Sequence, residues 1–281
     1  MEHIKINNLK INYWDSKSAN LKSIIFIHGN SHSLRSFRHQ LNHPILKKFR
    51  LIAIDLPGHG DSEAHSSYDM NLFANTLKSF VDELQLSEIV LVGHSLGGHI
   101  AIESIPLIHP LGVFIFGTPP LKKPMVTHGF KNNPNMSLLQ KNALSEEEIK
   151  SLLSALYTQH NPTFEDCQEL LNTDPAFREL MAQSFAQGIF ADEIEILKSF
   201  KGKLAVVCGL SDSLIDFNYL MTELDPDKLW SNTVITLDAP HNMHIEKSEE
   251  VSFLIGNFAE SAFSNEIFYK PDEMVRSTVS I

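Results

Sequence analysis

Short apolar runs, each followed by a polar cluster, alternate along the chain with longer segments of helical periodicity. The runs occur at residues 23–27, 50–54, 89–92, 113–116, 204–208 and 233–237. A short run without polar alternation is typical of a strand covered on both faces, as in a parallel sheet. The alternating residues 4–13 instead predict two short strands that turn at Asn7-Asn8.

The segments between these runs predict helices. Residues 70–84 place one apolar face along the helix, made of Leu72, Phe73, Thr76, Leu77, Phe80, Val81 and Leu84. Helices are also expected at 98–108 and at 248–262. Strands that alternate with helices predict an α/β fold with a mostly parallel central sheet and right-handed crossovers.

The alternation of strands and helices does not continue through residues 121–200, because they contain no convincing strand pattern. Ser145 and Glu148 form a capping box that opens one helix, and further helices are expected at about 163–172, 175–187 and 190–199. We therefore expect a core of residues 1–120 and 201–264 and an all-helical cap at 121–200. No structure is predicted for the tail, residues 265–281.

Composition and charge narrow the classes of protein. Hydrophobic residues make up 43% and charged residues 20% of 281 residues, which is typical of a globular protein, and the net charge is −11. This charge disfavours nucleic acid or an anionic membrane as partner. No run of about 18 apolar residues and no signal-peptide pattern occurs, so we expect a cytoplasmic protein. Cys167 and Cys208 have no metal or redox spacing and are interpreted as buried thiols.

The candidate nucleophile is Ser95. In a parallel sheet, ligands bind beyond the carboxyl ends of the strands, and the unusual polar clusters all follow predicted strands. Gly93-His94-Ser95-Leu96-Gly97 matches G-x-S-x-G between an apolar strand and a helix, which is the context of a strained nucleophile turn. The alternative is a glycine-rich turn with an inert serine.

A serine nucleophile needs a base and an acid. The chain order serine, acid, histidine leaves two histidines, of which His241 is preferred because His244 is better placed to pack in the closing helix. Asp212 follows the penultimate strand directly and is preferred to Asp216 in the same loop. The acid would hold the imidazole tautomer and stabilise the imidazolium.

An oxyanion hole requires two fixed donors. The backbone N–H of Leu96 is one candidate, and the loop after the first long strand should supply the other through Asn30. The Asn30 side chain is either a third donor or a turn-forming asparagine. Metal-dependent hydrolysis is disfavoured, since no H-x-H-x-D-H or H-E-x-x-H spacing occurs.

Four motifs together resemble the α/β-hydrolase superfamily: HGN at 28–30, DLPGHGDS at 55–62, GHSLGGH at 93–99 and APHNMHIE at 239–246. That family usually carries glycine before the catalytic histidine, where this sequence has Pro240, and a dehalogenase or epoxide hydrolase would carry Asp where Ser95 stands. FIHGNSHS, SLGGHIAIE, GTPP and Leu229-Trp230 are most similar to the serine-dependent N-acyl-homoserine lactonases. This resemblance implies lactone opening without metal, an acid on Asp212 where the group has glutamate, and a helical cap.

The expected function is therefore cleavage of a small-molecule carboxylic ester or lactone through an acyl-enzyme, without a cofactor. The alternatives are another carboxylesterase, a C–C bond hydrolase, a perhydrolase, or a small-molecule receptor, because fold and triad do not choose among them. The oligomeric state is not predicted. Apolar residues of the cap are expected either to line an acyl pocket or to pack the cap helices together: Leu152, Leu153, Leu156, Tyr157, Phe164, Phe177, Phe185 and Phe190. Tyr157, Phe185 and Phe190 are the preferred substrate-binding candidates.

Overall fold

A computed structural model of the chain describes residues 1–124, 127–159 and 162–264. Its centre is an eight-stranded sheet with the order β1-β2-β4-β3-β5-β6-β7-β8. The strands are β1 (Glu2–Ile6), β2 (Leu9–Asp15), β3 (Lys22–Ile27), β4 (Arg50–Ile54), β5 (Glu88–His94), β6 (Gly112–Phe116), β7 (Lys203–Gly209) and β8 (Ile235–Leu237). β2 pairs antiparallel with β1 and β4, and the remaining pairs are parallel.

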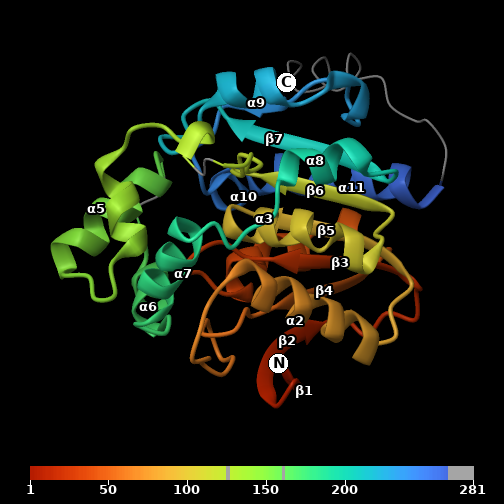
Figure 1. Cartoon of the computed structure of the whole chain (residues 1–281). Helices are drawn as coiled ribbons and strands as arrows, with labels where there is room; N and C mark the ends of the chain where they lie inside the picture. The colour runs from red at the N-terminus through yellow and green to blue at the C-terminus, as the bar shows by residue number, and fades with distance from the viewer. Residues whose placement is uncertain (125–126, 160–161, 265–281) are drawn as a thin grey trace.

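Helices cover both faces of the sheet (Figure 1). They are α1 (Arg38–Asn42), α2 (Met70–Glu83), α3 (Leu96–Glu103), α4 (Ile105–Ile108), α5 (Glu146–Leu156), α6 (Phe164–Asn172), α7 (Phe177–Ala186), α8 (Glu193–Ser199), α9 (Phe217–Glu223), α10 (Met243–Glu246) and α11 (Ser248–Ser264). No helix among the residues described has the length and apolarity that crossing a bilayer requires.

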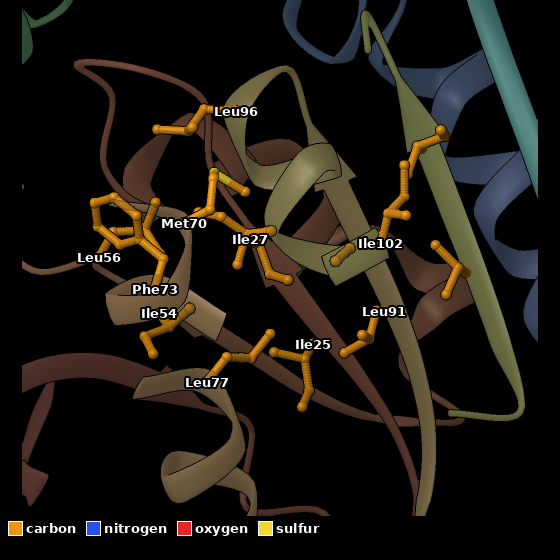
Figure 2. Packing of buried hydrophobic residues seen from close by; sticks show 14 of the residues in the cluster. Ile25, Ile27, Ile54, Leu56, Met70, Phe73, Leu77, Leu91, Leu96 and Ile102 are labelled. Atoms are coloured by element: carbon orange, nitrogen blue, oxygen red, sulfur yellow. The ribbon is translucent and has the colours of Figure 1, made fainter. Parts of the chain in front are cut away.

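Alternate residues of each strand supply two separate cores. Ile25 and Ile27 of β3 pack in the cluster that includes residues of α2 and α3, whereas Ile24 and Phe26 belong to the cluster that includes residues of α11. Figure 2 shows the first of these clusters, where Phe73 and Leu77 of α2 lie near the strand side chains. Burial on both faces explains why the parallel strands are apolar throughout.

The sequence predicts the strands and long helices of the core well, with small differences. Asn7 and Asn8 have φ of 50° and 70°, the left-handed pair that a two-residue hairpin requires. β8 covers only residues 235–237 of the predicted 233–237. The helix expected at 98–108 is interrupted at Ser104, because the following Pro106 lacks an N–H for the helical hydrogen bond.

Residues 121–200, which we call the helical segment, contain α5 to α8 between β6 and β7. Ser145 and Glu148 form both bonds of the predicted capping box. The described residues of this segment form no strand longer than an isolated bridge. Figure 1 shows α5, α6 and α7 grouped to one side of the sheet, while α8 contacts α3.

Several features differ from the prediction or fall outside it. The short helices α1, α9 and α10 are too brief to show periodicity in the sequence. Both cysteines are free; Cys208 is buried, but Cys167 is only half-buried, because it lies on α6, outside the sheet core. The tail at 265–281 lies outside the residues that the structure describes.

Candidate active site

Ser95 occupies a tight turn between β5 and α3. Its backbone has φ of 51° and ψ of −118°, a conformation that costs a non-glycine residue about 1–3 kcal/mol. The flanking glycines are required sterically: a Cβ on Gly93 would lie 2.4 Å from the Gly97 oxygen, and one on Gly97 would lie 2.1 Å from the Ile27 oxygen. The Ser95 amide donates to the Phe116 oxygen (3.0 Å), which ties the turn to β6.

Asp212 and His241 form a buried pair. His241 Nδ1 donates to Asp212 Oδ2 at 2.8 Å, and Asp212 Oδ1 accepts the amides of Leu214 (2.8 Å) and Ile215 (3.2 Å). Burial would raise the pKa of Asp212, but the charge and hydrogen bond of His241 and the two amides hold that pKa below its ordinary value. Asp212 is therefore an ionised acceptor that fixes the proton of His241 on Nδ1 and leaves Nε2 able to accept a proton.

Asp216 and His244, the alternatives that the sequence leaves for the acid and the base, make different contacts from Asp212 and His241. Asp216 is the N-cap of α9 and accepts the Asn218 amide at 2.9 Å. His244 is fully buried in α10, with its ring centroid 4.5 Å from that of His94 and 5.3 Å from that of Phe37. Burial lowers the pKa of His244 well below its ordinary value. It packs as a helix-face histidine, though in α10 rather than in the closing helix.

Ser95 and His241 come from segments that meet at the carboxyl ends of β5, β6 and β8. The ring centroids of His94 and His241 are 4.9 Å apart, and His94 Nε2 donates to the His241 oxygen at 3.2 Å. A Cβ on Gly117, just after β6, would lie 3.0 Å from His241 Cε1. Ser95 Oγ makes no hydrogen bond to His241 among the described residues, an arrangement that often tightens only when substrate binds.

The loop at residues 28–33 packs against the turn that carries Ser95. A Cβ on Gly29 would lie 2.9 Å from His94 Nδ1 and 3.3 Å from Ser95 Cβ. In the described part of the chain, neither the Asn30 amide nor the Leu96 amide donates to a protein group. Asn30 Oδ1 accepts the Ser31 hydroxyl at 2.6 Å. Two backbone amides, one directly after Ser95 and one in the loop that packs against its turn, therefore have no protein acceptor among the described residues.

The end of α5 rests on the loops that carry Asp212 and His241. The Asn242 amide donates to the Leu156 oxygen at 3.0 Å, and Ser213 Oγ donates to the Ala155 oxygen at 2.9 Å. Tyr157 follows directly; its hydroxyl donates to Asp166 Oδ1 at 3.3 Å. The structure therefore brings Tyr157 next to the His241 loop.

Phe185 and Phe190 lie elsewhere. Their rings pack edge to face with centroids 6.0 Å apart, and the neighbouring Ala191 amide donates to Glu103 at the far end of α3 (2.8 Å). Residue 103 is about 12 Å along the helix axis from residue 95. Other apolar side chains of the segment pack in the core cluster: Leu152, Leu153, Leu156 and Phe177. Phe164 does not pack in this cluster, because it is 73% exposed.

Several residues at the site were not predicted from the sequence. Thr118, in the GTPP motif, donates to the Ser95 oxygen at 2.9 Å. Arg178 and Glu169 of the helical segment bond to Ser31 and Ser33 in the loop at 28–33. No sequence motif marks these two residues. Across residues 1–124, 127–159 and 162–264, no group of three or more His, Cys, Asp or Glu side chains is arranged to hold a metal ion.

Comparisons with known proteins agree with this geometry. A sequence model described as the alpha/beta hydrolase family matches residues 24–252. The AB hydrolase superfamily protein YisY of Bacillus subtilis (strain 168) is 24% identical over 255 residues, covering 85% of this chain and 92% of YisY. Epoxide hydrolase 4 of Mus musculus is 33% identical over 101 residues, which cover 35% of this chain and 28% of that protein.

The solved structures include a match over nearly the whole chain. A crystal structure of a variant of the N-acyl homoserine lactonase AidH, complexed with N-hexanoyl homoserine lactone, superposes with a TM-score of 0.86. It is 27% identical in sequence, and the match covers 93% of this chain and 97% of AidH.

Proposed function

The chain belongs to the alpha/beta hydrolase family, and from this premise we propose that it is a serine hydrolase that cleaves a carboxylic ester or lactone through an acyl-enzyme. The observation that carries the proposal is the position of Ser95, in its strained turn, next to His94, whose ring centroid lies 4.9 Å from that of His241 in the buried pair with Asp212. A serine at this position also separates the chain from the epoxide hydrolases, whose nucleophile is a carboxylate.

Each residue has a role in the proposed reaction. His241 Nε2 takes the Ser95 proton as the hydroxyl oxygen attacks the carbonyl carbon, and Asp212 stabilises the resulting imidazolium. The amides of Asn30 and Leu96 donate to the oxyanion, assisted by the N-terminal dipole of α3. His241 then protonates the leaving alcohol, and water releases the acyl group by the reverse sequence. The reaction needs no metal or cofactor.

The proposed substrate is an N-acyl homoserine lactone. This assignment is supported by the likeness to AidH over nearly the whole chain. We propose that the helical segment acts as a cap over the site and that Tyr157, beside the His241 loop, contacts the bound acyl-lactone. Phe185 and Phe190 remain candidates for the far end of an acyl pocket. The main alternative is a carboxylesterase that uses the same residues.

A substrate panel tests the proposal. The purified protein is assayed with homoserine lactones of short and long acyl chains and with p-nitrophenyl esters, and intact-mass spectrometry follows an acyl adduct on Ser95. We expect multiple turnovers of the lactones, a dependence on acyl length, and no adduct in the Ser95→Ala variant. Turnover of simple esters alone would favour the carboxylesterase. A single turnover followed by arrest would favour the receptor, and undiminished turnover by Ser95→Ala would contradict a serine mechanism.

A further inference from the structure

Arg178 of α7 is a buried cation without a carboxylate partner among the described residues. Its side chain is nearly inaccessible, with 3% of the residue exposed. Burial lowers the pKa of the guanidinium, which nevertheless stays charged in proteins. Burying an unpaired charge is costly unless hydrogen bonds compensate it. The acceptors of Arg178 therefore indicate what the charge is used for.

The guanidinium donates to three acceptors. Two are backbone oxygens of the helical segment: Leu170 at 2.7 Å from Nη2 and Asn142 at 3.2 Å from Nη1. The third is Ser31 Oγ, in the loop at 28–33, at 2.9 Å from Nε. The first two bonds hold the segment together. The third crosses from the segment to the loop that contains Asn30.

The direction of these hydrogen bonds is fixed by chemistry. A guanidinium has donors only, so Ser31 Oγ must accept from Arg178. The Ser31 hydrogen is thereby directed to its other partner, Asn30 Oδ1, at 2.6 Å. Hydrogen bonds in such a chain strengthen one another in a buried environment. The charge of Arg178 therefore polarises the hydroxyl that holds the Asn30 carboxamide.

This chain of bonds determines which end of the Asn30 side chain is available. With Oδ1 bound to Ser31, the Nδ2 donors are left for other acceptors. Ser31 itself is fully buried and has φ of 60°, which a non-glycine residue adopts at a cost. The contact with Arg178 compensates part of that cost and keeps the loop in place against the Ser95 turn.

We propose that Arg178 is a positioning residue of the helical segment, which acts through Ser31 to hold the loop that carries the Asn30 amide and to turn the Asn30 Nδ2 group toward the oxyanion. The inference rests on the proposed function, since it assigns Asn30 to the oxyanion hole. Among the described residues, the guanidinium of Arg178 bonds to Ser31, Asn142 and Leu170 and not to Ser95. In this arrangement the helical segment contributes to the rate of the chemical step as well as covering the site.

A second contact between the same two regions provides a matched control. Ser33 Oγ donates to Glu169 Oε1 of α6 at 2.6 Å, but no bond leads from Ser33 to Asn30. Ser33→Ala therefore removes one tether between loop and segment and leaves the chain through Ser31 intact. A purely structural role for such tethers predicts similar effects of Ser31→Ala and Ser33→Ala.

The experiment is a double-mutant cycle of Ser31→Ala and Arg178→Met, with Ser33→Ala alongside. Steady-state kinetics on N-hexanoyl homoserine lactone and p-nitrophenyl butyrate are combined with thermal melting. Complete loss of one oxyanion donor costs about 10²–10³-fold in kcat, so we expect misorientation in Ser31→Ala to cost roughly 10-fold, with KM within about twofold. Because both changes break one chain, the double variant should have nearly the kcat of Ser31→Ala.

The outcomes distinguish this inference from the function on which it rests. An unchanged kcat in Ser31→Ala, an equal kcat loss in Ser33→Ala, or multiplicative losses in the double variant would overturn the positioning role. If Arg178→Met does not fold, the kcat difference between Ser31→Ala and Ser33→Ala decides alone. Absence of turnover of both substrates by the wild-type protein would instead refute the proposed function.

Discussion

The loops at the carboxyl ends of the strands and the helical segment approach the candidate site with different kinds of contact. In the loops, backbone bonds to the strands hold the key residues: the Ser95 amide binds the Phe116 oxygen, and the Asp212 amide binds the Gly209 oxygen (3.1 Å). The segment makes one backbone bond at the site, to the Asn242 amide, but it reaches the loop at 28–33 through side chains, as when Arg178 binds Ser31 at 2.9 Å. Backbone contacts persist when side chains change, whereas side-chain contacts do not.

This difference separates two properties of the site. The identity of the chemistry depends on residues whose position the sheet fixes, so variants there should lose rate while the fold remains. The segment supplies contacts that can be replaced one at a time, so variants there should change stability, pH response or rate in smaller steps. Paired variants in the loops and in the helical segment test this difference.

The largest expected effect comes from the base. His241→Ala removes the group that takes the Ser95 proton, and loss of a catalytic histidine lowers kcat by roughly 10⁴–10⁶-fold. Because the His241 loop is held to the Asp212 loop by a backbone bond, from the Ser211 amide to the Ala239 oxygen (3.1 Å), the melting temperature should change little. Ester hydrolysis rates and differential scanning calorimetry measure both quantities.

His244→Leu is the matched control for the base. The His244 ring packs among Phe37, His94 and Phe116, and neither ring nitrogen has a hydrogen-bond partner among the described residues. Leucine fills a similar volume without a polar group, so kcat should stay within a few-fold of wild type. Equal losses in the two histidine variants would refute the assignment of His241.

The acid is expected to have the next largest effect. In Asp212→Asn the new amide can donate to His241 Nδ1, which moves the imidazole proton to Nε2 and removes the base; the comparable change in a serine protease costs about 10⁴-fold in kcat. Asp216→Asn in the same loop retains an N-cap for α9 and should leave kcat unchanged. If Asp216→Asn lowered kcat as much as Asp212→Asn, both the acid and the division between the regions would be wrong.

The sequence predicts the loops at the carboxyl ends of the strands better than it predicts the helical segment, because backbone bonds to the strands place those loops. Strand order and the G-x-S-x-G turn determine where Ser95 and Asp212 lie, because local backbone geometry fixes both. The pairing of Arg178 with Ser31, 147 residues apart, depends on how α7 packs against the loop. Periodicity predicts that α7 is a helix, but it does not say which loop an arginine on that helix reaches.

Apolar residues of the segment illustrate the same limit. Phe164 and Phe177 are alike in the sequence, yet Phe177 is fully buried and Phe164 is 73% exposed. Phe177 is buried because its ring packs edge-on against Tyr68 and His59, with centroids 5.4 Å and 4.3 Å away. Tyr68 and His59 lie in the loop after β4. The sequence of the segment alone therefore does not indicate that Phe177 has partners and Phe164 does not.

The smallest expected effect belongs to the segment and is a change in pH response. Burial raises the pKa of Glu169 from 4.5 to about 7, although the Ser33 hydroxyl opposes the shift. Between these values the folded chain keeps a proton that the unfolded chain has released. The stability contributed by the protonated form is therefore complete below about pH 4.5 and is lost as the pH rises through 7.

Glu169→Gln tests this sign, because glutamine imitates the protonated acid and still accepts the Ser33 hydroxyl. The variant should melt with the wild type near pH 5 and several degrees above it at pH 8, while kcat stays within about twofold. Glu103, whose pKa burial also raises to about 7, is present in both proteins and cancels in the difference. A melting difference that is independent of pH would show that Glu169 is ionised in the folded chain. A large fall in kcat would show that the segment's contact with Ser33 controls the chemistry as directly as the loops at the carboxyl ends of the strands do.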